Sequence, residues 1–89
     1  MSRSGRYAVL IKKAAEREME SLPPAVFARV ASAILTLEAA PRQRRAKKLQ
    51  GRDAYRLRVG DYRVLYTVSD SARTVEIMAV GHRRDVYRG

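Results

Sequence analysis

The chain has 89 residues and no cysteine, and 19 basic against 9 acidic side chains give it a net charge of +10 at pH 7. That length provides one domain with a small core. The missing cysteine excludes disulfides, thiol catalysis and zinc–thiolate sites. No signal peptide is evident at the start, and no segment is apolar for long enough to span a bilayer. We therefore expect a single cytoplasmic domain, residues 1–89, with no membrane partner.

The positive charge is concentrated after Pro41. Residues 1–41 carry six basic and four acidic groups, whereas residues 42–89 carry thirteen and five. Fifteen of the nineteen cations are arginine, whose planar guanidinium matches phosphate oxygens and stacks on bases. This excess predicts a polyanionic partner. The alternative is a surface charge that only keeps the protein soluble.

Patterning predicts a strand and two helices before Pro41. Residues 7–11 alternate and are rich in β-branched side chains, which is typical of a strand. Apolar residues recur every three or four positions over residues 12–22, and again after Pro23-Pro24. The second apolar stripe is Val26, Phe27, Val30, Ile34 and Leu37. We expect the two helices to form a hairpin with one shared buried face.

The second half of the chain predicts a meander of strands. Residues 42–53 are a polar, basic connection, and Gly81 is expected to end the last strand. The strand-like runs between them are 55–59, 62–68 and 74–80. The order β-α-α-β-β-β predicts an α+β domain with a short C-terminal tail. In it the N-terminal strand and helical hairpin pack on one face of a mostly antiparallel sheet.

The turn at Gly60-Asp61 fixes the register of the hairpin that it closes, because two residues with glycine first favour a type II′ turn. In that register Arg58 lies directly opposite Arg63, and Arg56 extends the row. Like charges in that position are destabilising, and a phosphate between the two guanidinium groups would offset the repulsion. The alternative is a solvated sheet face whose cations prevent aggregation.

The tail adds different chemistry. His82 is the chain's one imidazole, the side-chain type whose unperturbed pKa lies nearest neutrality. Arg83 and Arg84 add cations, and Tyr87 is an aromatic on which a base can stack. Taken singly, a structural role is the more common one for a lone histidine or tyrosine. One histidine and scattered carboxylates give no metal-ligand cluster, so we expect no metal and no cofactor.

Three segments resemble the RelE/ParE superfamily of toxins from prokaryotic toxin–antitoxin pairs. They are AKKLQG (46–51), YRLRVGDYRVLYTV (55–68) and VGHRRDVYR (80–88). Within that superfamily the RelE-like branch cleaves messenger RNA in the ribosomal A site, whereas the ParE-like branch poisons DNA gyrase. The resemblance favours the RelE-like branch, because the basic and aromatic positions of that branch are all filled here.

The resemblance implies a role for each of these side chains. Catalytic residues would be Arg56, Arg58, Arg63, Arg83 and Tyr87. Substrate-binding residues would be Lys47, Lys48, His82 and Arg84. The best-known members carry lysine where this chain has Arg56 and Arg58. Because arginine stays protonated and is a poor base, either electrostatics activates the 2′-hydroxyl, or His82 helps, or cleavage is slow.

The function so implied is a toxin that acts as a ribosome-dependent endoribonuclease, through metal-independent attack of the 2′-hydroxyl. Its partners would be a cognate antitoxin and messenger RNA on the 70S ribosome, with contacts to ribosomal RNA. Two alternatives stay open. One is a ParE-like, non-enzymatic inhibitor of gyrase, and the other is a catalytically weak toxin that serves as an antitoxin-binding module.

Overall fold

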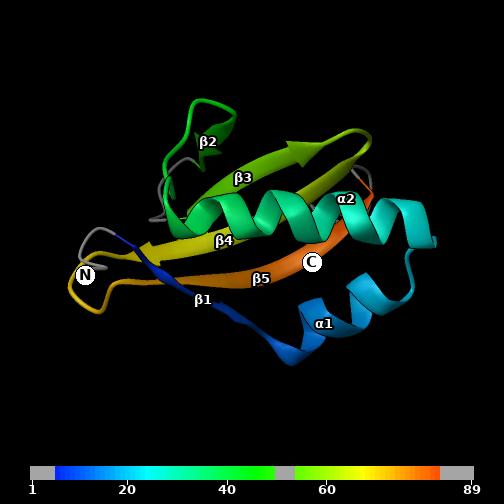
Figure 1. Cartoon of the computed structure of the whole chain (residues 1–89), viewed down its shortest axis with the longest axis horizontal. Helices are drawn as coiled ribbons and strands as arrows, with labels where there is room; N and C mark the ends of the chain where they lie inside the picture. The colour runs from blue at the N-terminus through cyan, green and yellow to red at the C-terminus, as the bar shows by residue number, and fades with distance from the viewer. Residues whose placement is uncertain (1–5, 50–53, 83–89) are drawn as a thin grey trace.

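The computed structural model of the chain describes residues 6–49 and 54–82. They form two layers, a five-stranded sheet and two helices that cover one of its faces (Figure 1). The predicted α+β class and order of elements are confirmed, with one strand added. The elements are β1 Ala8–Ile11, α1 Lys13–Glu20, α2 Pro24–Leu35, β2 Ala46–Lys48, β3 Ala54–Val59, β4 Tyr62–Ser69 and β5 Thr74–His82.

The strands lie in the order β1-β5-β4-β3-β2, with β1 parallel to β5 and the other pairs antiparallel. The turn between β3 and β4 has φ of +61° at Gly60, the left-handed conformation that a type II′ turn places at its first position. A side chain is strained there, so glycine supports the turn and through it the register.

The helices follow the predicted pattern with one exception. Ala15 and Met19 are the buried residues of α1, and α2 buries Val30, Ala33 and Ile34 before it tightens into a 3₁₀ turn, Thr36–Glu38. Phe27, expected in the buried stripe, is 40% exposed. The adjacent Val26 packs against the core instead, so the buried stripe at the start of α2 passes through Val26 rather than Phe27.

The connection 42–53 was expected to hold no strand, and this is wrong. Residues Ala46–Lys48 form β2, which pairs antiparallel with Leu57–Tyr55 at the edge of the sheet. Three residues, two of them lysine, are too few to show alternation. An edge strand rich in lysine is also protected against pairing with other chains, so its composition resembles that of a polar loop.

The last strand does not end at Gly81 as expected. β5 continues to His82, with Gly81 opposite Arg63 and His82 opposite Tyr62. A β-bulge at Met78 shifts the register, since Leu65 pairs with Ala79 and the next residue of β4 pairs with Ile77. A bulge inserts one residue and reverses which side chains face the helices beyond it.

The core lies between the helices and the inner face of the sheet. Leu37, Leu57, Val64, Tyr66 and Ile77 are fully buried there. The hydroxyl of Tyr66 donates a hydrogen bond of 2.7 Å to the carbonyl of Pro41, which satisfies the buried polar group. Burial raises the pKa of Tyr66 to about 12. This tyrosine therefore anchors the start of the basic half of the chain.

Beyond the bulge, α1 rather than β1 supplies a hydrogen-bond acceptor for the backbone of β5. β1 pairs with β5 only as far as Ile77, and a carboxylate oxygen of Glu18 accepts a 2.8 Å hydrogen bond from the N–H of Val80. Val80 is 1% exposed. Without Glu18, this N–H has no acceptor in the part of the chain described.

We therefore expect Glu18→Ala to lower the free energy of unfolding by about 1–3 kcal/mol, the cost of a buried donor left unsatisfied. Glu18→Gln keeps an acceptor and should lose less than half of that. Urea denaturation of both variants measures the difference. Equal stability of the two variants would remove this role from Glu18.

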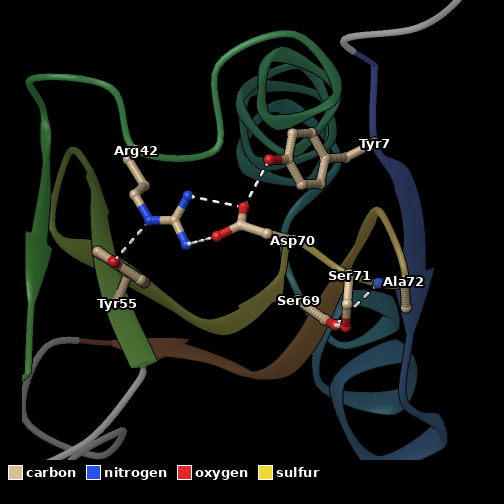
Figure 2. Close-up of polar contacts among 7 residues, drawn as sticks. All are labelled: Tyr7, Arg42, Tyr55, Ser69, Asp70, Ser71 and Ala72. Carbon is tan, nitrogen blue, oxygen red and sulfur yellow. Dashed lines mark hydrogen bonds and ion pairs between the residues drawn. The ribbon is translucent and has the colours of Figure 1, made fainter.

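A polar network joins four segments at the end of the sheet away from Gly60 (Figure 2). Arg42 donates two hydrogen bonds of 3.0 Å to Asp70, and its Nε donates one of 2.8 Å to the hydroxyl of Tyr55. The hydroxyl of Tyr7 donates to Asp70 at 2.6 Å. These bonds from Arg42 and then Tyr7 lower the pKa of Asp70 below its ordinary 3.8.

Because the pKa of Asp70 is lower in the folded state, the network contributes stability above pH 3.8 and loses it as the pH falls through the lowered value. Asp70→Asn should destabilise the protein modestly at neutral pH, since the pair is exposed. The difference between the variant and the wild type should vanish below that range. Thermal unfolding from neutral to acid pH measures it, and a pH-independent difference would contradict the assignment.

Candidate functional site

The β3–β4 hairpin holds two arginines face to face. Arg58 and Arg63 are Cα partners across the hairpin, so the predicted register is confirmed. Arg56 lies one alternation along β3, and Lys47 of the edge strand is its direct partner. Side chains alternate along strands, and Leu57 and Val64 face the helices. These four cations therefore share the opposite face, the arginine face.

Arg63 is buried rather than solvated. It is 6% exposed, and within the described residues its Nε and Nη1 atoms are buried with no hydrogen-bond partner. A charged group in that state costs several kcal/mol of desolvation. Glu76 shares the face but lies opposite Thr67, two side chains along β4 from Arg63. Arg63 therefore adds a positive charge and two donors, unsatisfied within the part of the chain described, beneath this face.

An open hollow of about 470 Å³ lies on this face at the edge of the sheet. Its described lining is Arg44, Arg45, Lys47, Arg56, Arg58 and Gly60, with no carboxylate among them. Arg44 and Arg45 were not among the site residues predicted from the sequence. They directly precede β2. Identifying residues 46–48 as a strand from the sequence would therefore have placed them at the site.

Two predicted site residues lie on the other face. Lys48 is the partner of Tyr55 on the helix side. His82 is the partner of Tyr62, and their rings meet edge to face at 5.6 Å. Without the bulge, alternation from Ile77 would have put His82 on the arginine face. The bulge puts Gly81 there instead, beside Arg63, and the imidazole is turned away from the arginines.

Three further predicted residues, Arg83, Arg84 and Tyr87, lie outside the described residues. Among those described, no three His, Cys, Asp or Glu side chains are grouped to hold a metal ion. None of the described helices is both long and apolar enough to cross a membrane. The described site is thus a cationic sheet face around one buried guanidinium.

This combination defines a small basic α+β domain with a cationic sheet face. The family model for the ParE toxin of type II toxin–antitoxin systems, parDE, matches residues 9–87. Toxin RelG of Mycobacterium tuberculosis is 34% identical over 84 residues, 92% of this chain and 97% of RelG. The chain belongs to the RelE/ParE superfamily of toxins.

Solved structures agree with the fold. A chain of the RelBE2 toxin–antitoxin complex from M. tuberculosis is 33% identical with a TM-score of 0.79, covering 88% of this chain and 99% of that one. A chain of the archaeal RelE–RelB complex from Pyrococcus horikoshii is 34% identical, also with a TM-score of 0.79, covering 90% and 98%. Both likenesses extend over nearly the whole domain.

The burial of Arg63 has a measurable consequence. Arg63→Met should raise the free energy of unfolding by about 1–4 kcal/mol, because it replaces an unpaired buried charge with a side chain of similar length. Phosphate should raise the melting temperature of the wild type and not that of Arg63→Met. Arg17→Met, on the exposed side of α1, is the control for lost charge. A lower free energy of unfolding for Arg63→Met than for the wild type would contradict the conclusion that Arg63 is an unpaired buried charge.

Proposed function

We propose that the protein is the toxin of a toxin–antitoxin pair and cleaves messenger RNA in the ribosomal A site. The observation that supports this most directly is the placement of Arg63, buried opposite Arg58 with two donors unpaired within the described residues. A forked cation paired with a second cation suits the negative charge that develops on a phosphate during transfer. The similarity to RelG and to RelE chains agrees with this reading.

In the proposed reaction the 2′-hydroxyl attacks the adjacent phosphate in line. The products are a 2′,3′-cyclic phosphate and a 5′-hydroxyl. Arg58 and Arg63 hold the phosphorane and neutralise its developing charge, while Arg56 favours loss of the 2′-hydroxyl proton. Because His82 faces the helices, the proton passes to solvent. Electrostatics then replaces a side-chain base, and the reaction needs no metal.

The tail completes the proposal. Arg83 stabilises or protonates the leaving 5′-oxygen, and Tyr87 stacks on a base to orient the nucleotide. Lys47, Lys48 and Arg84 bind ribosomal RNA, without sequence preference and with strong salt dependence. The ribosome aligns the messenger, which suits a site without a strong base.

A cognate antitoxin is the proposed protein partner. The RelBE2 and Pyrococcus RelE chains come from toxin–antitoxin complexes. On this basis we expect an antitoxin with an acidic or amphipathic segment that wraps the helices and sheet. It neutralises the toxin by covering the arginine face or displacing the tail. Both proteins act in the cytoplasm.

Cleavage of ribosome-bound messenger by purified protein tests the activity. Arg63→Ala should lower the cleavage rate by about 10²–10³, the usual cost of one donor to a transition-state oxyanion, and Arg17→Ala should leave it unchanged. A deoxynucleotide at the scissile position should block cleavage. Undiminished cleavage by Arg63→Ala, or cleavage at the deoxynucleotide, would overturn the mechanism.

Gyrase inhibition is the second candidate, because the matching family model is that of ParE toxins. Inhibition of supercoiling by the wild type, with translation unaffected, would favour it over messenger cleavage. The third alternative, a module that only binds antitoxin, predicts full antitoxin binding with neither activity. Mapping messenger ends after brief induction separates the three.

A further inference from the structure

The hollow on the arginine face does not end at the edge of the sheet. A second hollow, of about 440 Å³, lies between α2 and the β3–β4 hairpin, with Arg29 and Arg45 as its cations. Arg45 and Gly60 line both hollows. The two therefore adjoin at the hairpin end of β3, one on the arginine face and the other on the side covered by α2.

Gly60 and the outer edge of β3 lie where the two hollows adjoin. β2 pairs with β3 only at residues 55–57, so the end of β3 next to the hairpin has no strand on the edge away from β4. Arg45 lies there, and its Nη2 donates a 3.0 Å hydrogen bond to the carbonyl of Arg58. A methyl group at Gly60 would lie 3.1 Å from Nη2 of Arg29. The absence of a side chain at Gly60 thus lets the guanidinium of Arg29 lie against the turn where the two hollows adjoin.

Positive charge extends across both hollows. We call the following residues the cationic band: Arg29, Arg44, Arg45, Lys47, Arg56 and Arg58. The described linings of both hollows contain no carboxylate. The ion pairs formed wholly within the described residues, Arg6–Glu38 and Arg42–Asp70, do not involve Arg29, Arg44 or Arg45. Six like charges on one strip favour a partner with regularly repeated negative charge.

We propose that the cationic band binds the backbone of single-stranded RNA that flanks the scissile nucleotide. The band begins beside the Arg58–Arg63 pair and turns around the end of a hairpin. A flexible strand follows such a turn, whereas a duplex, with a persistence length of about 150 base pairs for DNA, does not. This inference rests on the proposed ribonuclease function, and it adds Arg29, Arg44 and Arg45 as binding residues outside the predicted catalytic set.

The salt dependence of RNA binding tests the proposal on the full-length toxin. The probe is a short, fluorescent, single-stranded RNA with 2′-O-methyl groups, which block 2′-hydroxyl attack. Its affinity is measured by anisotropy between about 50 and 200 mM salt. The band variant is R29Q/R44Q/R45Q. The control is K12Q/K13Q/R17Q, which loses the same charge from exposed positions around α1.

For a single strand the slope of log affinity against log salt falls by about 0.7 for each phosphate contact removed. The band variant should therefore lose about 2 units of slope, and the control should keep the wild-type slope. R29K/R44K/R45K, which retains the charge, should also keep it. Equal slopes for the band variant and the control would overturn the proposal.

Two other outcomes separate this proposal from the ribonuclease function. If the band variant loses affinity for the cognate antitoxin while its RNA slope is unchanged, the band is a protein interface and the proposal fails. If the RNA slope falls as expected but the wild type cleaves no ribosome-bound messenger, the band stands as an RNA site. In that case it is the ribonuclease function that fails.

Discussion

The cross-strand pairing of Arg58 with Arg63 is an unfavourable contact that favourable contacts around it maintain. Its register is that of Leu57 with Val64 and Tyr55 with Tyr66, and the two tyrosine rings stack at 5.7 Å. A slip of one residue would turn these apolar side chains away from the core. Burial of the inner face is worth far more than the repulsion between two guanidinium groups on the outer face, so the arginines remain opposite each other.

The backbone of β5 likewise determines which residues lie beside this pair. Its bulge at Met78 directs Val80 toward the core and sets Gly81, without a side chain, beside Arg63. Glu18 of α1 then holds the strand through the N–H of Val80. A helix on one side of the sheet thereby holds the strand whose Gly81 lies opposite Arg63. The site is built on strands, which hold side chains more rigidly than loops do.

Local sequence rules were sufficient to predict which residues pair in the β3–β4 hairpin. Gly60-Asp61 and the alternation on either side of it determine which residues pair, so Arg58 and Arg63 could be placed opposite each other from the sequence. The burial of Arg63 could not, because alternation places it on the sheet face away from the helices, where a strand pattern predicts exposure. The sheet face on which His82 lies is set by the bulge in β5. A bulge reverses the facing of every later residue of the strand, and no distinctive sequence signal marks it. β2 was missed because an edge strand of three residues has too little pattern to detect.

The state of Arg63 has a consequence for how a substrate would be used. Removing a guanidinium from water is costly, and here folding has already incurred that cost before any anion binds. A phosphate entering the site then meets donors that need not shed water or reorient, which is how fixed dipoles and charges stabilise a transition state most effectively. Such a site gains its rate from charge and alignment rather than from proton transfer by a base. It therefore depends on whatever delivers the substrate in line, and a strand held along a cationic surface meets that need.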